Sequence, residues 1–345
     1  GVSRQLNLGA IMLVGAAGPR VVVRRALATG PARGLAMDVF DRTLKRHHRE
    51  RAALDPEVGN YGYLRDEVAE RLMERLEDVH ESYQFAEAAD VGCGSGHIRR
   101  ALVGRGVSRL NEFDSSPAML AAAAQSEVDF EVVQHEMEDE VRVLPRETYD
   151  LVASSMALHW VNDLPGALAG FRRALKPDGL FLGAMLGGDT LQEMRSAFVL
   201  ADLERRGGVA QRMSPLCSVA DAGALMQSAG FSLPTVDTEV ITIHYPDAWT
   251  LWHHLRAMGE SHATVNRAAS DQTTLLTAAA IYRELYGDAD GNIPATFQII
   301  YFAGWSPHES QPKPLQRGSG TISLKDLELP GGIQMPPDPS DEPKK

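Results

Sequence analysis

The residues best suited to bind a ligand form one short glycine-rich stretch. Asp90 is followed by Gly92, Gly94 and Gly96 at the end of the apolar segment 88–91. Glycine accepts the positive φ angles of a tight turn and lets the backbone approach a ligand, and a helix that begins just beyond such a turn presents unpaired N–H groups. The stretch therefore predicts a ligand-binding turn between a strand and a helix. A turn of the same shape without a ligand is the alternative.

The spacing of the glycines separates two classes of ligand. A dinucleotide site with the pattern G-x-G-x-x-G needs a small residue at position 97, where helix and strand pack, but this chain has His97. The pattern G-x-G-x-G after an acidic residue resembles the first motif of class I S-adenosylmethionine (SAM)-dependent methyltransferases. In that family the turn wraps the methionine part of SAM. The resemblance implies that the cofactor-binding residues here are Asp90, Gly92, Cys93, Gly94 and Gly96.

A second acidic residue, Asp114, lies about twenty residues beyond the turn. Its two oxygens suit the two hydroxyls of a ribose, and its position matches the second acidic residue of the family. Capping of a helix that begins near Pro117 is the alternative, and both roles can hold at once. We expect Asp114, with Ser115 beside it, to bind the cofactor. The resemblance implies an acid that contacts adenine in the run 136–140, and the sequence does not identify which one it is.

The residues expected at the chemistry follow a strand predicted over 149–155. Ligands bind at the carboxyl ends of parallel strands, and in class I methyltransferases this strand end faces the transferred methyl group. Ser154 therefore joins the predicted cofactor site, and His159 and Trp160 are the catalytic candidates. In the alternative interpretation, Trp160 packs beneath the next helix and His159 makes only a local hydrogen bond.

The elements that must position these residues alternate between strands and helices. Apolar residues at helical spacing predict an amphipathic helix over 63–80, and helices are also expected over 97–103, 221–229 and 273–286. Further strands are expected over 107–112, 128–133, 180–185, 236–245 and 295–305. The resemblance implies an α/β fold of class I SAM-dependent methyltransferases: Rossmann-like, doubly wound, with a mostly parallel seven-stranded sheet and a helical cap.

The first 37 residues differ from the rest of the chain in charge. They hold five arginines and no acidic residue, which is typical of a mitochondrial targeting segment. A secretory signal is the alternative, because residues 6–17 are largely apolar. We favour mitochondrial targeting because Arg24 and Arg25 lie beyond that apolar stretch, where a secretory signal would already have been cut.

The remaining chain divides by composition and pattern. An N-terminal helical extension over 38–83 precedes the predicted SAM-binding domain over 84–305, which carries a helical insertion at 246–287. Its basic run, up to Arg51, is interpreted either as a solvated helix end or as a docking element. The tail over 306–345 holds eight prolines and few large apolar residues, so it cannot pack a core of its own.

Overall composition narrows the classes of partner. The net charge of −12 opposes nucleic acid as the main partner, whereas a cationic ligand such as a sulfonium is not opposed. The two cysteines, Cys93 and Cys217, suggest neither a disulfide framework nor a zinc site. No apolar run is long enough to predict a membrane-spanning helix. No metal site is expected, because the only His-x-acid triplet, 48–50, lies in a basic run outside the predicted fold.

Several longer segments resemble one family more specifically. Segments 158–165, 183–191, 258–261 and 308–311, together with 40–46, resemble the mitochondrial complex I assembly factor 5 family over about residues 38–326. The bacterial malonyl-carrier-protein methyltransferases are more distant relatives. Ser95 departs from the larger basic residue usual in the assembly factor.

This resemblance implies a SAM-binding protein of the mitochondrial matrix, at most peripheral at the inner membrane. It implies hydroxylation of an arginine in an iron–sulfur subunit of complex I, together with other assembly factors. Methyl transfer to a protein or carrier-bound acid, and a non-catalytic platform, are the alternatives. For a substrate arginine we expect an acidic rim formed partly by Asp163, Asp189 and Glu260.

Overall fold

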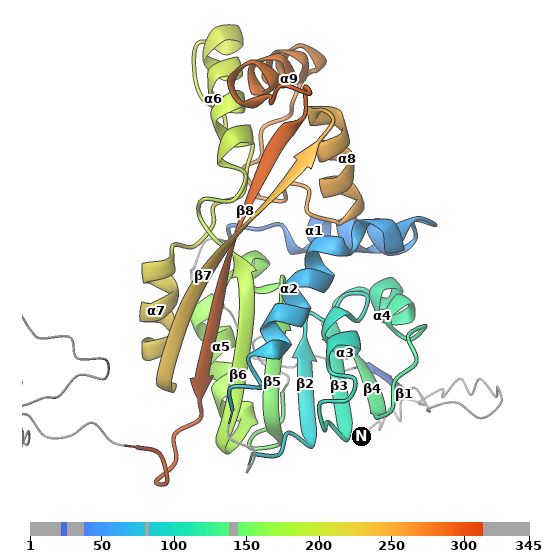
Figure 1. Cartoon of the computed structure of the whole chain (residues 1–345), viewed down its shortest axis with the longest axis vertical. Coiled ribbons are helices and arrows are strands. Elements are labelled where there is room, and N and C mark those ends of the chain that lie inside the picture. Colours follow the sequence, from blue (N-terminus) through green and yellow to red (C-terminus); the bar gives the residue numbers. More distant parts are fainter. Residues whose placement is uncertain (1–21, 26–37, 80–82, 138–143, 313–345) are drawn as a thin grey trace, which may run out of the picture. The chain divides into compact units, whose positions relative to one another are not determined.

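The computed structural model describes residues 22–25, 38–79, 83–137 and 144–312. Most of the predicted targeting segment, the acidic residues 138–140 and the tail beyond residue 312 lie outside the described residues. Up to residue 308, the described chain forms a sheet with helices on both faces and a further group of helices near one end of the sheet (Figure 1).

Eight strands form a single sheet in the order β1-β4-β3-β2-β5-β6-β8-β7. Strands β1 to β6 run parallel to their neighbours in this order, while β8 runs antiparallel to both β6 and β7. The strands are β1 (Val22–Arg25), β2 (Glu87–Val91), β3 (Arg109–Asp114), β4 (Glu131–Glu136), β5 (Tyr149–Ser155), β6 (Leu175–Leu186), β7 (Ser232–Tyr245) and β8 (Ile293–Trp305).

This topology confirms the predicted doubly wound, mostly parallel fold of class I SAM-dependent methyltransferases. Strands β2 to β8 are the seven expected strands, and their order places β2 next to β3 and β5 at the centre of the sheet. Strand β1 is an eighth strand, paired with β4, and the sequence analysis did not predict it because it lies in the arginine-rich segment.

The helices cover both faces of the sheet, so the central strands are apolar on both sides. On one face α2 and α3 contribute Leu72 and Ile98, and on the other α5 and α7 contribute Phe171 and Met226. The helices are α1 (Arg42–Ala53), α2 (Tyr63–Glu74), α3 (His97–Ala101), α4 (Pro117–Ala123), α5 (Leu164–Ala174), α6 (Gln192–Arg206), α7 (Val219–Ser228), α8 (Ala248–Ala257) and α9 (Gln272–Tyr286).

The predicted helices are present, but the first one is shorter than expected. The helix predicted over 63–80 ends at Glu74 and is followed by turns up to residue 79. Leu76 and Val79 still pack against the core from these turns. Their apolar spacing therefore continued the helical pattern in the sequence after the backbone had left the helix.

Helices α6, α8 and α9 form a cap, the name used below for these three helices. Helices α8 and α9 lie in the predicted insertion 246–287, and α6 packs along α9. Figure 1 shows the cap beside the extended ends of β7 and β8, beyond the carboxyl ends of the parallel strands. The cap thus faces the edge of the sheet where the glycine turn follows β2.

Candidate functional site

The glycine turn has the backbone geometry that its sequence predicted. Gly92, Gly94 and Gly96 have φ angles of 79°, 57° and 81°. At Gly92 a side chain would also clash, because an added Cβ would lie 2.4 Å from the Cβ of Ala157. The turn therefore requires glycine both for its conformation and for the close approach of the segment after β5.

Asp114 ends β3 directly beside this turn. Its carboxylate accepts hydrogen bonds from the amides of Gly94 and Ser116, each at 2.9 Å, and from the Arg49 guanidinium at 2.6 Å. Burial alone would raise the pKa of Asp114, but Arg49 and the two amides outweigh burial and hold this pKa below its usual value. The alternative capping role belongs to Ser116, which is the N-cap of α4.

Asp90 lies at the end of β2 and is buried without a partner. Among the described residues, neither of its carboxyl oxygens has a hydrogen-bond partner, and only 1% of its surface is exposed. Burial, and then the nearby carboxylates of Glu112 and Asp114, raise its pKa well above the usual value. Buried polar groups in proteins are almost always hydrogen-bonded. A carboxyl group in this state fits a ligand that brings a donor, such as the ammonium of an amino acid.

The other predicted cofactor residues lie near the same turn with different surroundings. The Ser154 hydroxyl donates to the Val91 carbonyl at 2.7 Å and so ties β5 to β2. Cys93 is buried, and burial raises the pKa of its thiol well above the usual value. Ser115 lines a small cavity together with Gly92 and Asp114. Cofactor contacts by these side chains remain predictions.

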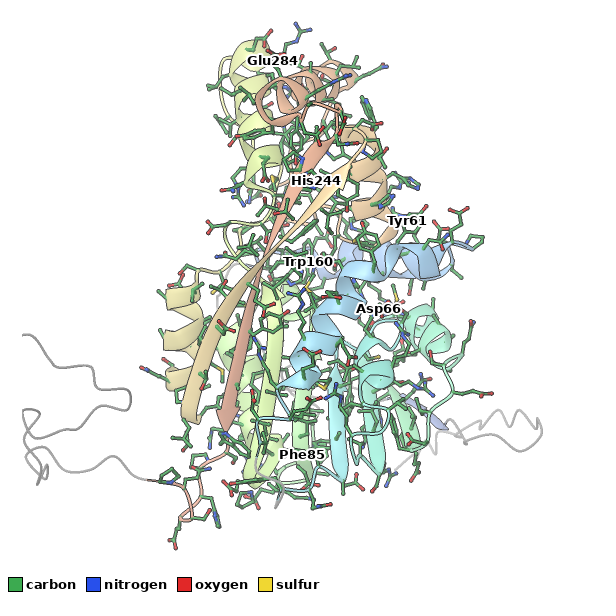
Figure 2. All side chains as sticks on the ribbon, viewed as in Figure 1. Tyr61, Asp66, Phe85, Trp160, His244 and Glu284 are labelled. Atoms are coloured by element: carbon green, nitrogen blue, oxygen red, sulfur yellow. The ribbon has the colours of Figure 1, made fainter. Side chains whose placement is uncertain are left out.

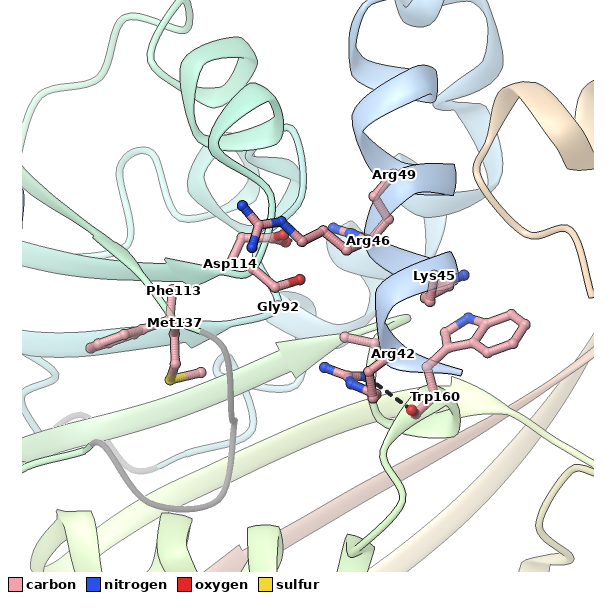
Figure 3. A pocket seen from close by; sticks show the side chains of 11 residues that line it. Arg42, Lys45, Arg46, Arg49, Gly92, Phe113, Asp114, Met137 and Trp160 are labelled. Carbon is pink, nitrogen blue, oxygen red and sulfur yellow. Dashed lines mark hydrogen bonds and ion pairs between the residues drawn. The ribbon is translucent and has the colours of Figure 1, made fainter. Parts of the chain in front are cut away.

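Helix α1 covers the glycine turn with a row of cations. Arg42, Lys45, Arg46 and Arg49 line the small cavity from one face of α1 (Figure 3). Arg49 reaches Asp114, and the Lys45 ammonium lies 3.5 Å from the centroid of the Trp160 ring. The free space left at the turn is about 20 Å³. Of the two interpretations of this basic run, the buried Lys45 and Arg49 side chains support the docking element over the solvated helix end.

Glu260, in the segment after α8, connects both catalytic candidates to α1 and α2. Its carboxylate accepts hydrogen bonds from Trp160 Nε1 at 2.8 Å, from Lys45 Nζ at 3.3 Å and from His159 Nε2 at 3.3 Å, and it pairs with Arg65 of α2. Burial would raise the pKa of Glu260, but Lys45 and Arg65 hold it well below the usual value. His159 and Trp160 therefore share a partner about a hundred residues away, rather than making only local contacts.

The protonation of this cluster follows from its geometry and burial. Burial lowers the pKa of His159 and lowers the pKa of Lys45 well below its usual value. Because Glu260 is the acceptor for His159 Nε2, we assign the ring proton to Nε2, which leaves Nδ1 as an acceptor. Within the described part of the chain, this Nδ1 atom is buried and has no hydrogen-bond partner. The lowered pKa keeps this imidazole neutral, so Nδ1 is an unused hydrogen-bond acceptor.

A large cavity lies on the other side of Trp160. Its volume is about 620 Å³, and residues of α2, α6, α8, α9 and β8 line it. Most of the lining is apolar or aromatic, as in Met194, Phe198 and Trp252, and Glu260 is the only acidic residue in it among those that the structure describes. Trp160 lines both cavities. Figure 2 shows Trp160 near α1 and α2, between Glu284 in the cap and Phe85 at the opposite end of the sheet.

The expected acidic rim is wrong in part. The Glu260 side chain is only 6% exposed and lies inside the cluster. The Asp163 carboxylate accepts the Gly166 amide at 2.9 Å as the N-cap of α5. Asp189 does not cap a helix, since α6 begins at Gln192 after the N-cap Leu191. The acid that could meet a substrate therefore lies in the interior.

Sequence reasoning missed the partners that surround the predicted site. The sequence leaves the basic run that holds Lys45 and Arg49 open between a solvated helix end and a docking element. It predicts Glu260 only as part of an acidic rim, and it gives no role to Arg65 in the amphipathic helix. A signal was present for α1, because its cations recur three and four residues apart, which places them on one helical face. Nothing in the sequence indicated that this face packs inward.

The described residues include neither a metal-binding cluster nor a membrane-spanning helix. Within the described ranges, no group of three His, Cys, Asp or Glu side chains is placed to hold a metal ion. The helices of those same ranges include none with both the length and the apolar character needed to cross a membrane.

Comparison with known proteins places this geometry in context. The family described as Methyltransferase domain matches residues 89–183. The chain is 44% identical over 299 residues to "Arginine-hydroxylase NDUFAF5, mitochondrial" of Danio rerio, covering 86% of this chain and 92% of that protein. The Homo sapiens protein of that name is 42% identical, and the match covers 90% of this chain and 89% of that protein. A "Malonyl-[acyl-carrier protein] O-methyltransferase" of Methylovorus sp. (strain MP688) is 33% identical, and the match covers 75% of this chain and 88% of that protein.

Proposed function

Because the chain belongs to the family of the mitochondrial arginine-hydroxylase NDUFAF5, we propose that it binds SAM at the glycine turn and hydroxylates an arginine side chain of a protein partner. The observation that carries the cofactor assignment is the buried Asp90, which lacks a hydrogen-bond partner among the described residues, beside three glycines with positive φ. Asp90 suits the cofactor ammonium, and Asp114 suits the ribose hydroxyls.

The large cavity is the proposed place for the substrate. It shares Trp160 with the cofactor side, and its volume of about 620 Å³ is in the range of ligand-binding pockets. Among the described residues, Glu260 is the only carboxylate in its wall, and it can bind a guanidinium. His159 lines the same cavity and contacts Glu260 through Nε2.

Hydroxylation and methyl transfer differ in the co-reactants that they need. Hydroxylation inserts one oxygen atom, so with dioxygen as oxidant two electrons from a reductant must reduce the second oxygen atom to water. When bound, SAM supplies an electrophilic methyl group on a positively charged sulfur. The matched methyltransferase domain and the carrier-protein methyltransferase relative support methyl transfer as the second candidate function. A non-catalytic platform is the remaining alternative.

The proposed partners follow from the family. We assign the chain to the mitochondrial matrix, at most peripherally associated with the inner membrane, where it acts on an iron–sulfur subunit of complex I with other assembly factors. Residues 1–37 serve as the targeting segment. The names of the relatives and the acid-free N-terminal segment support this assignment.

The test is mass spectrometry of the partner subunit after incubation with the purified protein, SAM, dioxygen and a reductant. The masses of an added oxygen atom and an added methyl group differ and can be mapped to one residue. An added oxygen atom on arginine supports the proposal, and an added methyl group supports the second candidate. No change in mass, with the partner still bound, would favour the platform.

A further inference from the structure

Lys45 and Arg49 lie one turn apart on α1 and both line the small cavity, and Lys45 also contacts Glu260 in the wall of the large cavity. Arg49 pairs with Asp114 on the cofactor side at 2.6 Å, and Lys45 donates to Glu260 at 3.3 Å and to the Gly259 carbonyl at 2.8 Å. Residues four apart lie on the same helical face. All four charged side chains are at most 7% exposed. A displacement of this helical face would therefore change both ion pairs.

On the cofactor side, α1 occupies both the Asp114 carboxylate and the space that the proposed cofactor needs. The Asp114 oxygen assigned to the ribose already accepts both Arg49 and the Gly94 amide. The free space of about 20 Å³ holds a water molecule, whereas ligand pockets usually measure about 300–1,000 Å³. The Lys45 ammonium over Trp160 would also repel a sulfonium placed nearby. Binding of the cofactor therefore requires Arg49, and with it this part of α1, to move.

On the substrate side, Lys45 of α1 contacts Glu260, the one acid that lines the large cavity among the described residues. Glu260 is the carboxylate that a guanidinium would choose, but it already receives Lys45, Arg65, His159 and Trp160. An incoming guanidinium would meet two buried cations at this carboxylate. Loss of the Lys45 contact would free part of the Oε2 atom and remove one like charge.

We propose that α1 couples the two sites, so that cofactor binding at Asp114 displaces Arg49, withdraws Lys45 and opens Glu260 to the guanidinium of the substrate. This inference rests on the proposed function and adds an order to it: the cofactor binds first and the arginine second. Lys45 and Arg49 are positioning residues in this scheme, and Glu260 is the residue that selects a cationic side chain. Coupling of this kind is reciprocal, because each ligand changes the affinity of the other by the same factor.

The experiment measures binding without turnover, by calorimetry, with S-adenosylhomocysteine as the cofactor probe and N-acetylarginine methylamide as the guanidinium probe. For the unmodified chain we expect saturating S-adenosylhomocysteine to raise affinity for the arginine probe roughly fivefold or more. Lys45→Met should raise affinity for the arginine probe in the absence of the cofactor probe and bring the coupling factor toward one. Arg49→Gln should tighten S-adenosylhomocysteine binding.

Two further variants serve as controls. Arg51→Gln removes a cation from the exposed side of the same helix and should change neither affinity nor coupling. Glu260→Gln should abolish binding of the arginine probe and retain binding of S-adenosylhomocysteine. If that variant fails to fold, as judged by circular dichroism, Lys45→Met and Arg49→Gln still decide the question.

The outcomes distinguish failure of the coupling from failure of the proposed function on which it rests. A chain that does not bind S-adenosylhomocysteine in any variant refutes the proposed cofactor, and with it the coupling. Cofactor binding with a coupling factor of one, or weaker cofactor binding in Arg49→Gln, overturns the coupling and leaves the cofactor assignment standing. Coupling that disappears in Lys45→Met and persists in Arg51→Gln supports the inference.

Discussion

The carboxyl group of Asp90 is buried at the end of β2, and within the described ranges neither oxygen has a hydrogen-bond partner. Burial raises its pKa well above the usual value, so the folded, ligand-free chain holds a proton that the unfolded chain releases. A raised carboxyl pKa gives stability at low pH that is lost as the pH rises through the folded pKa. At this residue, the requirements of stability and of ligand binding oppose each other.

We expect Asp90→Asn to stabilise the ligand-free protein increasingly as pH rises from 5 to 8, by about 1 kcal/mol or more at the upper end. The amide has no proton to lose, so it avoids the cost of an ionised, buried carboxyl group. Urea unfolding at several pH values measures this difference. A stability difference that stays constant with pH would show that Asp90 does not titrate in this range.

The same residue predicts a pH dependence of cofactor binding. An ammonium group binds the ionised carboxylate, so affinity for S-adenosylhomocysteine should rise with pH through the raised pKa of Asp90. Calorimetry in buffers of different ionisation enthalpy would detect the released proton. In Asp90→Asn the affinity should be lower and this part of the pH dependence should vanish; an unchanged profile would assign the proton to another group.

The glycine turn gives a third prediction at this scale. S-adenosylhomocysteine at about 100 times its Kd should stabilise the protein by about 2.7 kcal/mol. Gly94→Val should abolish the resulting thermal shift with little change in helical content, because Gly94 has a φ of 57° and lies beside Arg49.

Gly104→Val is the matched control for that variant. Gly104 also has a positive φ, of 76°, but an added Cβ there meets no atom within 4 Å. It should therefore lose backbone stability and keep the ligand-induced shift. A shift that survives in Gly94→Val would place the ligand elsewhere.

Residue types and spacing were sufficient to predict where the candidate site residues lie relative to the strands. The turn at Gly92, Asp114 at the end of the next strand and the pair His159 and Trp160 all lie within a few residues of strand ends, which local pattern identifies. Their partners could not be predicted in this way. Glu260 is about a hundred residues from Trp160, and only the packing of the cap segment against α1 brings the two together.

At the scale of elements, too, the sequence predicts the helices but not the distant contacts that decide which of their faces is buried. The amphipathic helix α2 and the βα alternation follow from apolar periodicity, and the sheet order is typical of the fold. Helix α1 carries a basic sequence, and its buried side chains include Lys45, His48 and Arg49. Charged residues are usually exposed, so composition favours the surface. The buried carboxylates Asp114 and Glu260 reverse that preference, and they come from distant segments.

A buried ion pair joins α6 of the cap to the chain that follows it. Asp202 binds Arg212 through two hydrogen bonds of 2.8 and 2.6 Å, and both side chains are at most 3% exposed. We expect Asp202→Ala to lower the free energy of unfolding by about 3–5 kcal/mol, because it leaves a buried, uncompensated guanidinium. Chemical denaturation measures the effect.

An exposed pair in the same cap provides the comparison. Arg206 and Asp271 are 42% and 53% exposed, so Arg206→Ala should lower the free energy of unfolding by less than about 1 kcal/mol. Equal losses in the two variants would mean that burial does not set the strength of these ion pairs. A small loss in Asp202→Ala alone would show that the cap can relax around Arg212.

At the scale of the whole molecule, we expect the arginine-rich N-terminal segment to direct the chain to mitochondria. Five arginines without an acid would be drawn toward the negatively charged interior of mitochondria. We expect the chain to be imported by isolated mitochondria and a chain beginning at Met37 to remain outside. If the shortened chain is imported and processed like the longer one, residues 1–37 are not the targeting segment.

The indole of Trp160 is a wall of both cavities and carries the Lys45 ammonium over its ring at 3.5 Å. The emission of an excited indole depends on the electric field across its ring. Both the Lys45 ammonium and the Glu260 carboxylate, which accepts the Trp160 Nε1 hydrogen bond at 2.8 Å, contribute to that field. Movement of α1 would therefore change the colour and lifetime of the light that this side chain emits. The chain holds three other tryptophans, so a variant in which those three are replaced would carry an optical probe of α1 without an attached dye, readable within the time of a single mixing experiment.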